Sequence, residues 1–189
     1  MALEGKLTIL REERPEDLPF LVALRNDLDT QAWSQTLPPD YTLGMYAKRL
    51  ESREFSYERD DGRFIVIEKE KGERVGSVVY SGVQSRWSAT IGIMISKSFW
   101  GGGYAMDALE VLLQFLFEEL GLRVVRLWTN SGNPRAIGSA EKLGFKLSLR
   151  QREAVFRKGQ LFDNIGMDLL REEFYALYPE LTDHLPPLR

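Results

Sequence analysis

The chain has 189 residues, and its 25 Lys and Arg against 28 Asp and Glu give a net charge of -3, which argues against general affinity for nucleic acid or anionic lipid. It contains no cysteine, which excludes disulfides, iron–sulfur clusters, thiolate zinc sites and covalent thiol catalysis. The one histidine, His184, lies among prolines, which disfavours a histidine metal cluster and a Ser-His-Asp triad. At this length we expect a single domain over residues 1–189, with a tail at 180–189.

The first half of the chain predicts one strand, two helices and then three more strands. Pro15 is typical of a first helical turn, and Asp61-Gly62 and Lys71-Gly72 are typical of hairpin turns. The expected strands lie at 7–13, 63–67, 74–80 and 88–96, and the expected helices begin at 15 and 43, on either side of a break at 37–40.

In the second half the period changes to that of a helix after residue 100. A strongly apolar helix over 105–120 is followed by Gly121, which is typical of a helix C-terminus. The remaining elements are a buried strand at 123–129, a helix from Pro134 to Gly144, two strands around Lys158-Gly159 and a helix at 171–178. We therefore expect an α+β domain on a mixed, mostly antiparallel sheet with helices on both faces.

Nothing in the chain predicts insertion in a membrane. No apolar run approaches the roughly 20 residues of a membrane-spanning helix, and the N-terminal residues lack the apolar stretch of a signal peptide. The expected location is therefore the cytoplasm, without a membrane or nucleic-acid partner.

The most informative segment joins a strand to a long helix through three glycines, Gly101 to Gly103. Consecutive glycines allow backbone conformations in which amide N–H groups converge. The helix that follows leaves its first N–H groups unpaired at its positive dipole end, an arrangement suited to phosphate or diphosphate. The plainer alternative is that the glycines only make a tight loop.

Two familiar phosphate motifs do not fit this segment. A P-loop requires Gly-Lys-Ser/Thr, and here Tyr104 follows Gly103. The dinucleotide fingerprint requires a small residue where Met106 stands, and it normally opens the first strand–helix–strand unit, whereas this turn follows several strands.

Several motifs in chain order resemble those of the GNAT superfamily of N-acetyltransferases, and most closely its ribosomal-protein-alanine (RimJ/RimL-like) branch. The resemblance covers nearly the whole chain. The motifs are Leu10-Arg-Glu-Glu-Arg-Pro-Glu-Asp17, Ile91-Gly-Ile-Met-Ile95, Trp100-Gly-Gly-Gly-Tyr-Ala-Met-Asp-Ala108, Asn133-Pro-Arg-Ala-Ile137, Glu141-Lys-Leu-Gly-Phe145, Arg152-Glu-Ala-Val-Phe156 and Asp163-Asn-Ile-Gly-Met167.

The resemblance implies the three-layer GNAT fold, with acetyl-CoA in a cleft where two parallel strands part. A primary amine, of a protein N-terminus or a small molecule, attacks the thioester directly, without a metal. Dimers are common in this branch, so the resemblance also allows a homodimer. The implied acetyl-CoA contacts are Met94, Ile95, Trp100, Gly101, Gly102, Gly103, Tyr104, Ala105, Met106, Asn133 and Arg135. Asn133 has an alternative role as a helix cap, and Arg135 an alternative as part of a solvated helix face.

The chain departs from the family at two places. The basic residue that is frequent in the family's glycine loop is replaced by Gly102. The tyrosine that many members use to protonate the leaving thiolate falls at Ala140, which leaves the neighbouring Ser139 as a substitute acid. These departures keep a second class of function open, a CoA-binding sensor or interaction module without activity.

The general base and the acceptor site are less clearly marked. Glu153 is the first candidate base, as a partly buried carboxylate that acts directly or through water, with an ordinary strand glutamate in an ion pair as the alternative. Asp163 is the second candidate, with a structural hydrogen-bond acceptor as the alternative. Aromatic residues that line the acceptor site, or that simply pack, are Trp33, Tyr41, Tyr80 and Trp87.

Overall fold

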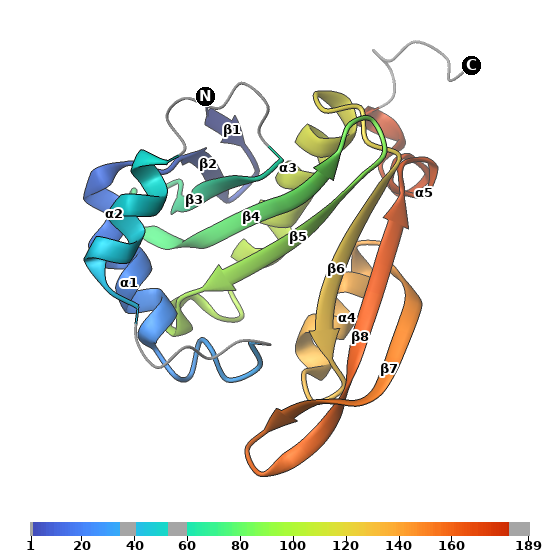
Figure 1. The fold of residues 1–189 in the computed structure, drawn as a ribbon. Coiled ribbons are helices and arrows are strands. Elements are labelled where there is room, and N and C mark those ends of the chain that lie inside the picture. Colours follow the sequence, from blue (N-terminus) through green and yellow to red (C-terminus); the bar gives the residue numbers. More distant parts are fainter. Residues whose placement is uncertain (1, 35–40, 53–59, 182–189) are drawn as a thin grey trace.

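The computed structural model describes residues 2–34, 41–52 and 60–181 (Figure 1). One 8-stranded sheet has the order β1-β2-β3-β4-β5-β6-β8-β7. The strands are β1 (Ala2–Glu4), β2 (Thr8–Glu12), β3 (Gly62–Glu68), β4 (Arg74–Gln84), β5 (Ser88–Ile95), β6 (Val124–Asn130), β7 (Lys146–Arg157) and β8 (Gln160–Leu170). The helices are α1 (Leu18–Asn26), α2 (Leu43–Glu51), α3 (Tyr104–Glu118), α4 (Pro134–Lys142) and α5 (Arg171–Leu177), with short 3₁₀ turns at Pro15–Asp17, Lys97–Phe99 and Pro179–Leu181.

The parallel pair β5 and β6 stays together for only part of its length. Every other neighbouring pair in the sheet is antiparallel. β5 and β6 are paired from Ser88↔Val124 to Ile91↔Leu127, and the rest of each strand continues without pairing with the other. Figure 1 shows the two strands diverging from this point. The sheet therefore opens between the ends of β5 and β6.

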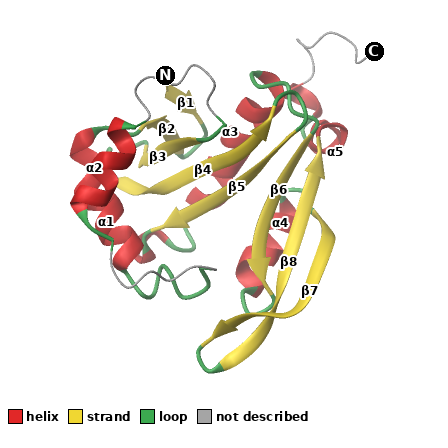
Figure 2. Ribbon diagram, in the orientation of Figure 1, coloured by secondary structure: helices red, strands yellow, loops and turns green. Residues whose placement is uncertain are grey.

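Helices cover both faces of the sheet, which confirms the predicted class (Figure 2). The larger core lies under α3, α4 and α5, and the smaller one under α1 and α2. α3 contributes Leu112, Leu113, Leu116 and Phe117 to the larger core, all fully buried. The spacing of these residues at three and four positions is the helical period that the sequence predicted.

The predicted elements are present, with several shifts. β1 was not predicted, and β2 buries Thr8 and Leu10 while Leu7 stays exposed, the opposite phase from the one that Leu7 and Ile9 suggested. Gly62 is the first residue of β3 instead of a hairpin turn. The other predicted turn, at Gly72, joins β3 to β4 with a φ of +72°.

An ion cluster fastens the start of α1 to the sheet. The fully buried Asp17 carboxylate lies 2.7 Å from Arg11 of β2 and 2.7 Å from Arg74 of β4, and it also accepts the backbone N–H of Arg14. Burial alone raises the pKa of Asp17, but these hydrogen bonds outweigh it and hold the pKa well below its ordinary value.

The C-terminal residues are only partly within the described structure. At the start of the predicted tail at 180–189, Pro179–Leu181 forms a 3₁₀ turn and Leu181 packs against the larger core. His184 and the break at 37–40 lie outside the described residues. Within the described ranges, no helix combines the length and the apolar character that a membrane crossing requires.

Candidate active site

The glycine turn lies at the open end of β5, directly before α3. Its start is fixed by Trp100, whose indole Nε1–H donates to the Ile95 carbonyl at 2.8 Å and whose backbone N–H donates to the Lys97 carbonyl. Gly101 and Gly103 have φ values of +84° and +82°, a region that side chains with a Cβ rarely occupy. The three-glycine segment therefore has the unusual backbone conformation that the sequence predicted.

The turn presents six successive backbone donors. Within the described structure, none of the N–H groups from Gly101 to Met106 has a hydrogen-bond partner, and the first that does is Asp107, which donates to the Gly103 carbonyl. Because these groups also stand at the positive end of the α3 dipole, they form an anion site of backbone donors.

Gly102 has a steric reason of its own. A Cβ at this position would lie 2.6 Å from Cε2 of the Tyr104 ring. That ring in turn packs edge-on against Phe99, with centroids 5.6 Å apart. The ring of Tyr104 thus supports the turn from within, and its backbone N–H belongs to the donor row.

Asp107, which sequence reasoning missed, anchors the turn to the N-terminal strands. Its buried carboxylate accepts the backbone N–H groups of Lys6, Leu7 and Thr8 at 2.8, 3.1 and 2.8 Å, and the Thr8 hydroxyl at 2.6 Å. The link between β1–β2 and the first turn of α3 fixes the helix terminus. An aspartate near a helix start was a signal, but its partners lie about a hundred residues away in the sequence.

The start of α4 faces the glycine turn across the opening. The Arg135 guanidinium lies 4.1 Å from the centroid of the Trp100 ring, a cation–π contact. Asn133 caps α4, because its side-chain oxygen accepts the Ala136 N–H at 3.2 Å. Its predicted contact with the pantetheine arm would use the side-chain NH₂ group and stays a prediction, as does a proton-donating role for Ser139 of α4.

A segment after α1 bridges the two diverging strands. At the β5 side, the Gln31 amide lies 3.2 Å from the sulfur of Met94. At the β6 side, the Trp33 carbonyl accepts from the Asn130 amide at 3.0 Å, and the Trp33 ring packs edge-on against Phe162. We call residues 31–34 the bridging segment. It brings Trp33, predicted for the acceptor site, to the mouth of the opening.

The Tyr41 hydroxyl accepts from Arg25 at 3.1 Å beside the bridging segment, but two other predicted acceptor residues, Tyr80 and Trp87, are not gathered there. Tyr80 packs between Phe64 and Phe115 in the core. Trp87 precedes the first residue of β5, whereas the glycine turn follows the last, so about 25 Å of strand separates them. Tyr80 therefore has a packing role, and Trp87 lies at the wrong end of β5 for an acceptor that enters through the opening.

Asp163 and Glu153 meet at an irregularity in β7. The Asp163 carboxylate accepts the Glu153 N–H at 2.9 Å and the Arg150 Nε–H at 2.6 Å. These two interactions lower the pKa of Asp163, which makes it a weaker base and favours the structural alternative. Glu153 itself has a φ of +53° and an exposed side chain instead of the partly buried one that we expected.

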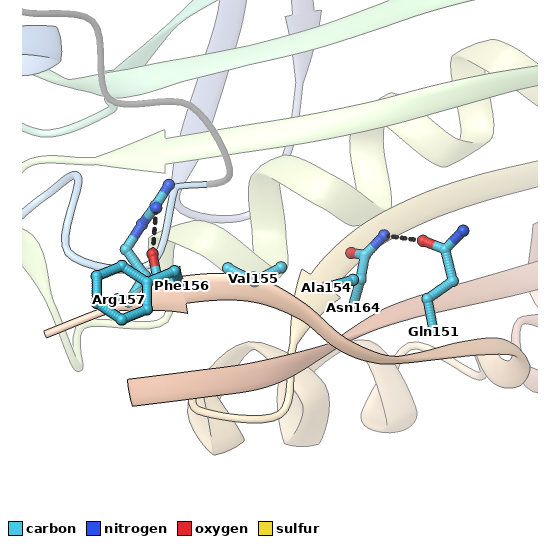
Figure 3. Close-up of a pocket in the computed structure, with 6 residues that line it drawn as sticks. All are labelled: Gln151, Ala154, Val155, Phe156, Arg157 and Asn164. Atoms are coloured by element: carbon cyan, nitrogen blue, oxygen red, sulfur yellow. Dashed lines mark hydrogen bonds between the residues drawn. The ribbon is translucent and has the colours of Figure 1, made fainter. Parts of the chain in front are cut away.

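A cavity of 430 Å³ opens along this part of β7 and β8 (Figure 3). Arg157 and Phe156 lie at one end, and a hydrogen bond of 2.7 Å from Asn164 to Gln151 lies at the other. The Arg157 guanidinium reaches back to the Ser34 carbonyl of the bridging segment. Arg157 therefore links the cavity to the bridging segment.

Comparisons with known proteins agree with this geometry. Among solved structures, the fold is similar to spermidine N-acetyltransferase from Vibrio cholerae in complex with CoA and spermine, with a TM-score of 0.81 and 22% identity over 90% of this chain and 99% of that one. It is also similar to a GNAT-family acetyltransferase from Bacillus anthracis, with a TM-score of 0.75 and 17% identity over 91% and 99%. At these identities the likeness shows the fold.

Sequence comparisons give the family. The chain is 27% identical to the SPbeta prophage-derived N-acetyltransferase YokL of Bacillus subtilis over 90% of this chain and 93% of the relative. It is 31% identical to the putative ribosomal N-acetyltransferase YdaF of the same organism over 46% of this chain and 47% of the relative. A family model described as Acetyltransferase (GNAT) domain matches residues 8–146.

The strand opening and the adjoining row of backbone donors form a site that can take an anionic cofactor. The chain belongs to the GNAT acetyltransferase family, and it is an acetyl-CoA-dependent N-acetyltransferase. Over the described residues, no group of three or more His, Asp or Glu side chains is placed to hold a metal ion.

Proposed function

We propose that the N–H groups from Gly101 to Met106 bind the diphosphate of acetyl-CoA, and that the acetyl group then lies at the end of β5 beside Met94. The observation that carries this proposal is the row of six donors that have no partner among the described residues, at the mouth of the strand opening. Arg135, stacked on Trp100, adds a positive charge beside the same turn. Main-chain donors thus take the place of the basic residue that the loop lacks at Gly102.

The transfer takes place in a ternary complex. The ammonium group of the acceptor first loses one proton; the neutral nitrogen then attacks the thioester carbonyl carbon, the carbon–sulfur bond breaks, and the second nitrogen proton passes to the sulfur, so that the products are the N-acetyl amine, CoA thiol and the one released proton. A chain with no cysteine has no thiol to carry an acetyl group between two half-reactions. Alignment of the two substrates can remove roughly 7–11 kcal/mol of the barrier. One backbone N–H at Met94 or Ile95, aimed at the developing oxyanion, supplies about 3–4 kcal/mol more.

Two proton transfers accompany the reaction: the acceptor ammonium group must lose a proton, and the departing thiolate must gain one. Glu153 is our proposed base, acting through water from its exposed position on β7. An α-amine, with a pKa near 8, demands less of such a base than an ordinary lysine-like amine with a pKa near 10.4. With Ala140 in place of a tyrosine, Ser139 or solvent protonates the departing thiolate.

For the acceptor we propose an amine of a protein N-terminus, as in the ribosomal-protein-alanine branch, or an amine of a small molecule. The name of the relative YdaF supports this branch, and the spermine in the solved structure from Vibrio cholerae shows the small-molecule alternative in that protein. A homodimer and a cytoplasmic location stay predictions from the sequence.

Two measurements test the proposal. Acetyl-CoA should raise the melting temperature, because a ligand that binds only the folded state stabilises it. Mixing the enzyme and acetyl-CoA with a panel of amines and N-terminal peptides should release CoA thiol with at least one of them. A thermal shift without thiol release from any acceptor would instead support the inactive CoA-binding module.

A further inference from the structure

Three cationic side chains meet on the bridging segment at the mouth of the opening. Arg25, at the end of α1, donates to the Gln31 side-chain oxygen at 2.7 Å and to the Ser34 hydroxyl at 3.4 Å. Arg157, near the end of β7, donates to the Ser34 carbonyl. Lys158, in the β7–β8 turn, places its ammonium group 5.0 Å from the centroid of the Trp33 ring.

These cations form a continuous path from the thioester position to the cavity. The Arg25 guanidinium lies 3.7 Å from the sulfur of Met94, at the end of β5 where the acetyl group is expected. Through Ser34, Arg25 adjoins Arg157, and Arg157 lines the 430 Å³ cavity (Figure 3). An acceptor that approaches the thioester from this cavity therefore passes the cationic groups of Arg157 and Arg25.

Two of the carboxylates near this path are paired with other cations, whereas Glu153, the proposed base, has an exposed side chain next to Ala154, which lines the cavity. Asp29 pairs with Lys97 at 2.6 Å, and Asp163 pairs with Arg150 at 2.6 Å. Of the six described residues that line the cavity, Arg157 alone carries a charge. The terminal nitrogens of Arg157 donate to the Phe156 and Ser34 carbonyls, and its buried Nε–H has no hydrogen-bond partner among the described residues.

We propose that the acceptor is an amine that carries a carboxylate a few atoms away, and that Arg157 and Lys158, with Arg25, bind this carboxylate. The inference rests on the proposed N-acetyltransferase function and narrows its acceptor. Opposite charges across a binding surface select the partner, and like charges reject the wrong one. A cationic polyamine would be repelled by the three cations at the mouth of the opening, although the whole protein has a net charge of -3. Free amino acids and peptides with an acidic residue next to the N-terminus both supply the required chemistry.

The test is thiol release from acetyl-CoA with matched acceptor pairs at about pH 9, where amines are substantially deprotonated. One pair is an amino acid and its C-terminal amide, the other a peptide that begins Ala-Asp and one that begins Ala-Asn, and spermidine is added as a cation. The carboxylate-bearing member of at least one pair should have a kcat/KM at least about tenfold higher than its neutral partner, the effect of one hydrogen-bonded charge. Which pair responds separates a small-molecule acceptor from a peptide.

Variants assign the preference to the cations. Arg157→Gln and Lys158→Gln should each bring the two members of the pair to within about threefold, while acetyl-CoA binding stays unchanged. Lys158 is exposed and in a turn, so Lys158→Gln gives a folded protein if Arg157→Gln does not. Lys71→Gln, in the corresponding Lys-Gly turn between β3 and β4, is the matched control and should keep the wild-type preference.

Two results would overturn the inference while the proposed function stands. They are a preference for spermidine, or equal kcat/KM values for both members of each pair in the wild type. A preference that survived in both Arg157→Gln and Lys158→Gln would remove these residues from the assignment. If acetyl-CoA bound but no acceptor released thiol, the proposed function would fail instead.

Discussion

Replacing Gly103 with valine should remove acetyl-CoA binding from a protein that still folds. Gly103 has a φ of +82°, and a Cβ there would lie 3.2 Å from a methyl group of Leu7, which is flexible and exposed. The cost to folding is therefore mainly backbone strain, about 1–3 kcal/mol. For a chain of this size, that lowers the melting temperature by roughly 2–12 °C.

The cost to binding should be larger, because the strain is relieved by moving the backbone that aligns the donors. A hydrogen bond to a charged group is worth about 1.5–3 kcal/mol. Misalignment of two donors at the low end of that range weakens acetyl-CoA binding by roughly 100-fold. At an acetyl-CoA concentration of about 100 times the wild-type Kd, ligand stabilisation is then expected to fall from about 2.7 to about 0.4 kcal/mol.

Gly72 provides a matched control for this experiment. It has a φ of +72°, a Cβ there would meet no atom within 4 Å, and it lies in the β3–β4 turn. Gly72→Val should therefore lose similar stability and keep the full thermal shift with acetyl-CoA. The reasoning is refuted if folded Gly103→Val binds acetyl-CoA with wild-type affinity in calorimetry, or if Gly72→Val loses binding equally.

Three further variants test separate parts of the site and fold. Arg135→Ala removes the stack on Trp100 and should weaken acetyl-CoA binding by about 2- to 30-fold in calorimetry, whereas an unchanged Kd would show that Arg135 does not contact the cofactor. Glu153→Gln should reduce thiol release by about 100-fold without altering acetyl-CoA affinity, and intact turnover would exclude Glu153 as the base. Asp17→Asn should lose about 3 kcal/mol of stability at neutral pH. Because folding lowers the pKa of Asp17, its contribution to stability is complete above the unfolded pKa near 3.9 and is lost as the pH falls through the folded pKa. In urea unfolding, the free energies of unfolding of the wild type and Asp17→Asn should therefore converge below about pH 4. A difference in stability that did not change with pH would contradict this.

Local patterns predicted most of the elements. The stripe of apolar residues in α3 repeats within one helix, and the turn at Lys71-Gly72 requires only its own backbone conformation. The glycine turn was found for the same reason, because the three glycines and the start of α3 are contiguous in the sequence. Signals of this kind are contained in a window of a few residues.

Features that depend on distant partners could not be found in this way. The phase of β2 is set by Asp107, which draws Thr8 inward through hydrogen bonds across about a hundred residues. The bridging segment joins the ends of β5 and β6 through Gln31 and Trp33, and its residues follow no periodic pattern. Glu153 was predicted as the base from its motif alone. Its side chain is exposed instead of partly buried, because it lies in the irregular part of β7 between Gln151 and Val155.

A crystal structure with bound acetyl-CoA tests the central claim most directly. We expect the diphosphate oxygens within hydrogen-bond distance of backbone nitrogens between Gly101 and Met106, with the thioester beside the end of β5 and the bridging segment facing it. Diphosphate density at another place on the protein, with those nitrogens still unpartnered at saturating ligand, would contradict the account.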